Sequence, residues 1–143
     1  MGKHKTIETP DQMWELFEAY KKTVIKNPIL IQDFVGKDGQ MVYRERQRPL
    51  TMEGFYNYCE DNLCCSHQYF ENRDNRYNDY VGICSRIKRS IRQDQIEGGM
   101  ASIYNPSITQ RLNGLTEKQD VTTNGKEIND IKVSIIRSGN KCD

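Results

Sequence analysis

The sequence contains none of the short motifs that mark a nucleotide-binding or hydrolytic site. The patterns GxxxxGK[ST], GxGxxG, HExxH and GxSxG are all absent. Its two histidines, His4 and His67, lack the neighbouring Asp or Cys arrangement that would make either one a general base. We therefore expect a protein without enzymatic activity, catalytic residues or a cofactor.

The sequence also lacks a long apolar stretch and an even set of cysteines. No run of about 18 apolar residues is present, so neither a signal peptide nor a membrane contact is expected. Five cysteines cannot all pair with one another, which favours a reducing intracellular compartment. Cys64, Cys65 and His67 lie close together, but their spacing supplies neither a CxxC pair nor a second ligand pair, so no metal site is predicted.

The chain also lacks the large excess of positive charge that is typical of nucleic-acid-binding proteins. The chain has 21 Lys and Arg against 20 Asp and Glu, so any nucleic-acid binding must be local. A length of 143 residues suits one compact core. With 36% hydrophobic residues and a mean hydropathy of −0.83, the apolar surface must serve both a modest core and contacts with other chains. Self-association is therefore expected.

A clear helix start stands near the N-terminus. Thr9, Pro10 and Gln12 have the pattern of an N-cap, a first helical residue and the end of a capping box. Asn27-Pro28 ends the helix at about Lys26. Its core face is expected to carry apolar side chains at helical spacing, namely Met13, Phe17, Tyr20 and Val24.

A β-hairpin is predicted next, with strands at residues 29–35 and 40–48 around a turn that contains two glycines. The two-residue period of the second strand places Arg44, Arg46 and Arg48 on one face. These arginines form either a ribbon that contacts phosphates or an ordinary solvated strand face.

Two short helices should follow, from a Thr51 cap to about Asp61 and from Ser66 to Asn72. Their tight connection suggests a helix-turn-helix-like unit, whose second helix would present polar residues to a major groove. Residues 53–79 nevertheless hold six acids and two bases, a balance of −4 that opposes phosphate binding. The expected groove-facing residues are His67, Gln68, Glu71 and Asn72 or Arg73.

A longer central helix is predicted from about Tyr77 to Glu97. Its apolar stripe suits packing against another helix, and a neighbouring subunit could supply that helix, so the stripe is a candidate oligomerisation surface: Tyr80, Cys84, Ile87 and Ile91. The same helix has four bases and no acid between Asp79 and Asp94. These bases form a second DNA surface, a seam for acidic neighbours or a solvated face: Arg86, Lys88, Arg89 and Arg92.

The end of the chain combines a short helix and a candidate strand. Gly98-Gly99 should weaken the central helix, and Asn105-Pro106 should start a short one that Asn113-Gly114 closes. Beyond it, Ile131, Val133 and Ile135 alternate with polar residues, which indicates a half-buried strand. In a ring such strands could pair between subunits and close a barrel; the alternative is a disordered tail.

These elements predict a mainly α fold with a small β-hairpin and a C-terminal β-strand. We expect an N-terminal helical domain at residues 1–76 that contains the hairpin and the helix-turn-helix-like unit. Central oligomerisation helices should occupy residues 77–118. A tail or strand at residues 119–143 would form an intersubunit barrel or contact a larger partner.

Two stretches carry a family resemblance. The first runs from Thr9-Pro10-Asp11-Gln12-Met13-Trp14 through the hairpin to Arg48-Pro49-Leu50-Thr51-Met52-Glu53-Gly54-Phe55, followed by Tyr58. The second, more specific stretch runs from Gly98-Gly99-Met100-Ala101-Ser102-Ile103-Tyr104-Asn105-Pro106-Ser107-Ile108 to Lys118. In this order they resemble the small terminase subunit, or DNA-packaging protein, of tailed bacteriophages. The connection between the two short helices departs from that family, because it lacks the usual glycine.

The resemblance implies a ring-forming adaptor in the cytoplasm of a bacterial host. Such a protein recognises double-stranded viral DNA and recruits and regulates a large terminase subunit that carries the ATPase and nuclease. The candidate DNA-binding residues are Lys3, Lys5, Arg44, Arg46, Arg48, His67, Gln68 and Arg73, and the candidate oligomerisation residues are the helical stripe together with Ile131, Val133 and Ile135. A helix-turn-helix transcription regulator and a structural phage protein without DNA binding are the alternatives.

Overall fold

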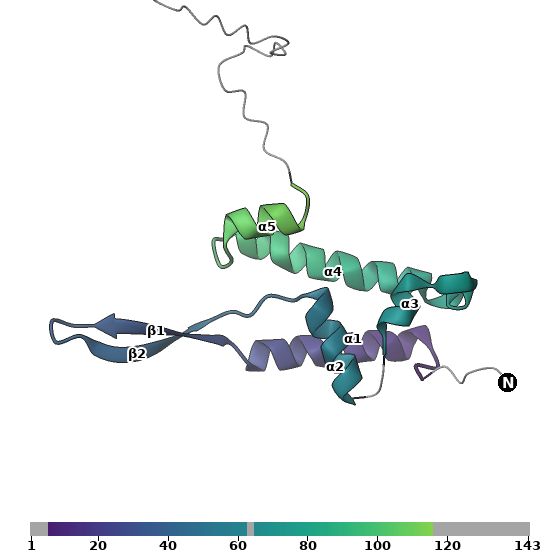
Figure 1. Ribbon diagram of the computed structural model, residues 1–143, viewed down its shortest axis with the longest axis horizontal. Coiled ribbons are helices and arrows are strands. Elements are labelled where there is room, and N and C mark those ends of the chain that lie inside the picture. The colour runs from purple at the N-terminus through teal and green to yellow at the C-terminus, as the bar shows by residue number, and fades with distance from the viewer. Residues whose placement is uncertain (1–5, 63–64, 116–143) are drawn as a thin grey trace, which may run out of the picture.

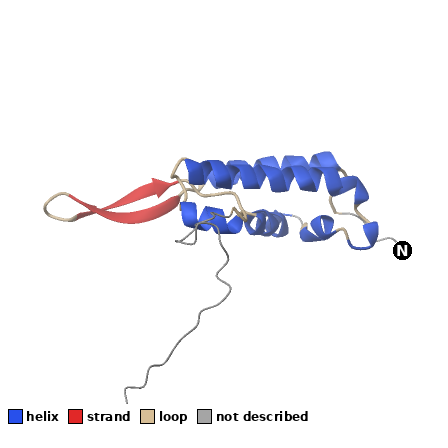
Figure 2. Cartoon of the chain, turned by 90° about the horizontal axis from the view of Figure 1, so that it is seen from above, coloured by secondary structure: helices blue, strands red, loops and turns tan. Residues whose placement is uncertain are grey.

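The computed structural model describes residues 6–62 and 65–115. Within them the fold is mainly α-helical with one antiparallel β-hairpin, as predicted (Figures 1 and 2). The expected strand around Ile131, Val133 and Ile135 and the candidate bases Lys3 and Lys5 lie outside the described residues. The elements in chain order are α1 (Pro10–Lys26), β1 (Ile29–Val35), β2 (Gln40–Arg46), α2 (Met52–Asn62), α3 (His67–Glu71), the 3-10 turns η1 (Arg73–Asn75) and η2 (Asn78–Tyr80), α4 (Val81–Met100) and α5 (Pro106–Leu112).

The start of α1 follows from its capping residues. The Thr9 hydroxyl oxygen accepts a hydrogen bond from the Gln12 backbone N–H at 3.2 Å. The Gln12 side chain turns back and its Oε1 accepts from the Glu8 N–H at 2.8 Å, one residue earlier than in a standard capping box. These bonds satisfy backbone donors that have no partner inside the helix, which fixes where α1 begins.

One hydrophobic core joins α1, α2 and α4. Phe17 of α1 and Phe55 of α2 are both fully buried and meet edge to face at 5.5 Å between ring centroids. Met13 and Ile87 are also fully buried, and α4 packs along α1. Residues 6–76 and 77–115 therefore contribute side chains to one core.

The apolar stripe of α4 lies in this core, which corrects its expected role. Tyr80 of η2 and Cys84, Ile87 and Ile91 of α4 are each at most 5% exposed, because they belong to the core that this chain forms by itself, in which α4 contacts α1 and α3. Their side chains are consequently unavailable to a neighbouring subunit. Any subunit contact must use other residues.

Two tyrosine hydroxyls fix the segment before α1. The Tyr69 hydroxyl accepts from the Ile7 N–H at 2.9 Å and also approaches the Ile7 carbonyl oxygen, at 3.3 Å. Tyr80 donates to the same carbonyl at 2.6 Å. Because Ile7 is only 1% exposed, these bonds satisfy buried backbone groups and tie the segment before α1 to α3 and η2.

Helix α4 begins four residues later and ends three residues later than the sequence indicated, and α5 folds back on its end. Gly98 and Gly99 do not interrupt the helix but are buried within its last turn, which ends at Met100. The Asn105 side chain then caps α5 by accepting from the Ile108 N–H at 3.2 Å. The two glycines provide the close approach that α5 requires.

Among the described helices, none has the length and apolar character needed to cross a membrane.

Candidate functional site

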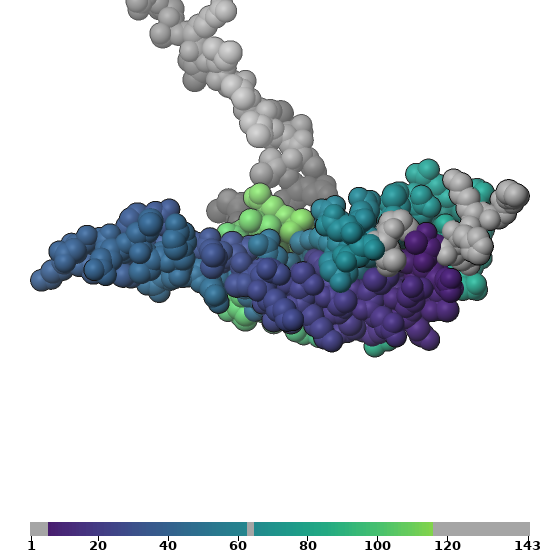
Figure 3. Space-filling model, turned by 90° about the horizontal axis from the view of Figure 1, so that it is seen from below, coloured from purple at the N-terminus to yellow at the C-terminus, as the bar shows by residue number. Residues whose placement is uncertain are grey.

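The hairpin projects from the end of the helical body as an arm, defined here as residues 29–46 (Figures 1 and 3). The strand register pairs Leu30 with Glu45, Gln32 with Tyr43 and Phe34 with Met41, so these side chains share one face. Leu30, Phe34, Met41 and Tyr43 are each more than half exposed. We call this the bare face of the arm.

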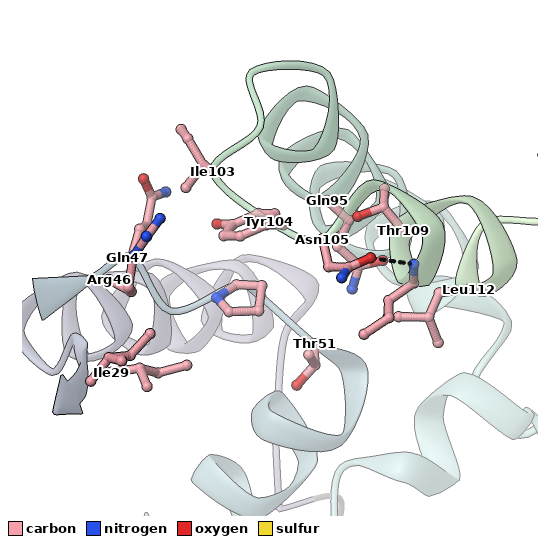
Figure 4. Close-up of a pocket in the computed structure, with 13 residues that line it drawn as sticks. Ile29, Arg46, Gln47, Thr51, Gln95, Ile103, Tyr104, Asn105, Thr109 and Leu112 are labelled. Atoms are coloured by element: carbon pink, nitrogen blue, oxygen red, sulfur yellow. Dashed lines mark hydrogen bonds between the residues drawn. The ribbon is translucent and has the colours of Figure 1, made fainter. Parts of the chain in front are cut away.

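The other face of the arm leads into an apolar groove at its base. Ile29 and Ile31 line one side of the groove together with Arg46. The opposite side comes from the end of α4, from α5 and from the loop between them (Figure 4). The groove encloses about 330 Å³, and its remaining lining residues are Gln47, Pro49, Thr51, Gln95, Ile103, Tyr104, Asn105, Ile108, Thr109 and Leu112.

A set of buried polar contacts holds the groove walls in place. The Asp94 carboxylate accepts from the Leu50 N–H at 3.0 Å and from the Tyr104 hydroxyl at 3.2 Å. Gln95 donates to the Leu50 carbonyl at 2.8 Å and accepts from the Asn113 side-chain amide at 3.2 Å. The ends of α4 and α5 are thereby fixed to the segment that follows the arm.

Tyr104 is the wall residue with the most perturbed acidity. Burial, the negative charge of Asp94 and the hydrogen bond to that carboxylate raise the pKa of Tyr104 to about 12, against a weaker opposing effect of Gln47. The phenol therefore keeps its proton throughout the neutral range and donates to Asp94. Its role in the groove is structural support.

The rim of the groove is unusually apolar for a protein surface. Ile108 and Leu112 of α5 are 57% and 68% exposed, and Met100, Ile103 and Leu115 are exposed beside them. Together with the bare face of the arm, these residues hold most of the large exposed apolar side chains of the described chain. Exposed apolar side chains gathered in this way are typical of an interaction site.

The three hairpin arginines do not form a single strand face. Strand β2 ends at Arg46, and Arg48 lies beyond it with its Nε donating to the Asn27 carbonyl oxygen at 2.8 Å. Arg44 forms an ion pair with Asp33 on the neighbouring strand. Arg46 remains on the edge of the groove. Arg44 and Arg46 thus share a strand face that Arg48 does not continue, and the guanidinium groups of Arg44 and Arg48 both have partners within the chain.

The bases of α4 form the more open positive surface. Arg86 stacks over the Trp14 ring at 3.8 Å, and Lys88 lies 5.7 Å from the centre of the Phe70 ring. Arg89 and Arg92 are exposed on the outer side of the helix. None of these four bases takes part in an ion pair recorded between described residues. Their charge is consequently available to an external anion.

The predicted groove-reading helix is present but short. Helix α3 has five residues, about 7–8 Å at 1.5 Å per residue, which is less than the width of a major groove. His67 is half-buried, Gln68 is exposed, and Arg73 pairs with Glu71 at 2.9 Å. The helices α2 and α3 keep a helix-turn-helix-like order, but their candidate DNA residues do not combine into a free basic surface.

No protein-family model matches this chain, and no curated protein matches it with significant similarity.

Sequence reasoning missed the groove, because its walls come from segments more than 40 residues apart. One signal was available in the strand Ile29–Val35, where apolar residues occupy both faces and do not alternate with polar ones. A two-stranded hairpin cannot bury both of its faces within a small chain. Such a strand therefore indicates a contact outside its own domain.

Proposed function

We propose that this chain is the small subunit of a viral DNA-packaging terminase, a ring-forming adaptor that binds double-stranded DNA. The proposal is supported chiefly by one observation: the same chain has both an exposed apolar arm and an apolar groove. Residues of both stretches that resemble the terminase family line this groove, including Ile29 and Pro49 from the first and Ile103 and Leu112 from the second. Some of the residues that carry the family resemblance are thus the same residues that line the apolar groove.

The proposed assembly is head to tail. The bare face of the arm and the rim of the groove are different surfaces, so a contact between them is heterologous, and such contacts generate closed rings when the rotation between copies is suitable. Asp94 and Gln95 hold the groove walls in place before any partner arrives. Little reorganisation is then needed on docking, which favours association.

DNA binding is assigned to the outer side of α4. Four exposed bases within seven residues have no acidic partner among the described residues, and Arg89 and Arg92 lie on the outer side of the helix. A ring repeats this modest cluster in every subunit, so a chain with almost no net charge can still present many phosphate contacts. Assembly and DNA affinity are therefore coupled in this proposal.

The large terminase subunit would supply the ATPase and nuclease, consistent with a sequence that has no phosphate-binding loop. Purified chain should release no phosphate from ATP, with or without duplex DNA, in a coupled hydrolysis assay. Turnover that persists through chromatography to constant specific activity would contradict the adaptor role.

The proposal is tested by mass photometry of the full chain at micromolar concentration, alone and with duplex DNA. A closed multi-subunit species that takes up one duplex is expected. The arm variant Phe34→Asp/Tyr43→Asp should fall to monomers, because it places two charges on the bare face. The control variant Val81→Asp places a charge at an exposed apolar residue outside the arm and the groove, so its assembled species should have the same mass as that of the parent protein.

A monomeric parent protein would refute the ring. A dimer that binds DNA would favour the transcription regulator instead, and an assembled species without affinity for DNA would favour a purely structural protein.

A further inference from the structure

The connection between α2 and α3 gathers three side chains of metal-binding type. Glu60 lies in the last turn of α2, Cys65 in the connecting segment and His67 at the first position of α3. One ligand atom from each, a carboxylate oxygen, the cysteine Sγ and an imidazole nitrogen, lie within 4.8 Å of one another. The three residues converge although they come from three successive pieces of the chain.

The local fold explains this convergence. Ser66, between the cysteine and the histidine, is fully buried, so its side chain occupies the inner side of the connection. Cys65 is exposed and His67 is half-buried, and both approach Glu60 on the outer side. The edge contact between the rings of His67 and Tyr56, with centroids 6.3 Å apart, places the imidazole against α2.

The donor set and spacing select the class of ion. Sulfur, nitrogen and oxygen donors together suit a borderline divalent metal such as Zn²⁺, whereas Mg²⁺ and Ca²⁺ prefer oxygen alone. Bond lengths of about 2.0–2.3 Å put the ligand atoms of a tetrahedral site roughly 3.3–3.8 Å apart. Glu60 and Cys65 are exposed, so rotation of these two side chains can shorten the distances towards that range.

We infer that Glu60, Cys65 and His67 form a zinc site with three protein ligands and one position open to solvent. The sequence pointed away from such a site because Cys65 and His67 offer no second ligand pair nearby. The third ligand comes from the preceding helix, which only the fold brings into range. A bound ion would tie the end of α2 to the start of α3, and this inference is independent of the proposed packaging function.

The test is calorimetric titration of the full, reduced, metal-free chain with Zn²⁺. One ion per chain should bind, and Glu60→Gln, Cys65→Ser and His67→Asn should each weaken affinity by at least about tenfold. Two matched controls, Asp61→Asn beside the site and His4→Asn at the other histidine, should bind as the parent does. Binding should weaken on acidification, because protons compete for the ligands.

Cobalt identifies the sulfur ligand. Co²⁺ added to the parent should give a thiolate-to-metal charge-transfer band that Cys65→Ser lacks. Cys65→His supplies a replacement ligand and should restore Zn²⁺ binding without that band, which separates loss of a ligand from loss of folding. A parent that binds no Zn²⁺, a band that survives in Cys65→Ser, or equal losses in the His4→Asn control would each overturn the site.

Discussion

At the scale of single residues, two glycines set how closely α5 approaches α4. A Cβ atom on Gly98 would overlap the Tyr104 ring, and one on Gly99 would lie 2.7 Å from Thr109 Cγ2. Both glycines are buried in the last turn of α4. Their lack of a side chain is therefore what allows the groove wall to form.

Gly98→Ala should lower the free energy of unfolding by about 1–3 kcal/mol, because Tyr104 must move from its contact with Asp94. Gly82→Ala is the matched control on the same helix, where an added Cβ meets no atom within 4 Å. That change should be neutral or stabilise by up to about 1 kcal/mol, since alanine favours the helix. Urea denaturation measures both, and equal stabilities for the two variants would contradict the packing described.

Tyr104 predicts a specific dependence of stability on alkaline pH. Its pKa is raised from 10.0 in the unfolded chain to about 12 in the fold, so the folded state holds the proton more tightly. The stabilisation is complete below pH 10 and is lost as the pH rises towards about 12. Denaturant unfolding at several pH values should therefore show a shallower decline in Tyr104→Phe than in the parent. Parallel profiles would show that the phenol is not perturbed.

Single residues also show which features of the structure can be predicted from the sequence. Thr9 and Asn105 were predicted as helix caps because capping acts over three residues of local chain. Asp94 was not recognised, since its partners Leu50 and Tyr104 lie 44 and 10 residues away. A half-buried carboxylate that joins distant segments of the chain leaves no local sequence pattern.

At the scale of elements, α4 serves two surfaces at once. Its inner stripe completes the core with α1, while its outer side carries the bases. The helical periodicity of the sequence predicted both the apolar stripe and the basic side. It could not show whether the helix that packs against the apolar stripe belongs to the same chain or to another one. That choice depends on where α1 lies, which is a property of the tertiary fold.

Replacing Lys88, Arg89 and Arg92 by Gln should weaken duplex binding and flatten its salt dependence. The slope of log affinity against log salt should fall in magnitude by up to about 2.7, at roughly 0.9 per phosphate contact. Fluorescence anisotropy between low and physiological salt measures this slope. The comparison variant with Gln at Arg44, Arg46 and Arg48 should change it less, because Arg44 and Arg48 have partners within the chain. The opposite ranking would move the DNA surface to the arm.

The hairpin likewise shows that a local sequence pattern predicts an element but not its position in the tertiary fold. Its strands and turn were predicted nearly to the residue, with Arg48 the main misplacement. Its direction relative to the body, and hence the groove at its base, depends on how the segment between β2 and α2 is anchored to Asp94 and Gln95. Those anchors form only after α4 has packed.

At the scale of the whole molecule, the described residues form a helical body that carries an apolar arm and an apolar groove. The two surfaces differ in shape and in residues, which predicts head-to-tail association. A symmetric dimer would instead require one surface to match itself. The two modes are distinguished by mixing variants that each lack one surface.

The most direct test is native mass spectrometry of the arm variant Phe34→Asp/Tyr43→Asp and the groove variant Ile108→Asp/Leu112→Asp. Each alone should be monomeric, because each lacks one half of the contact. An equimolar mixture should form a one-to-one heterodimer and nothing larger, since the intact arm of the groove variant can enter the intact groove of the arm variant. Two unchanged monomer peaks in the mixture, or rings formed by either variant alone, would contradict arm-in-groove assembly.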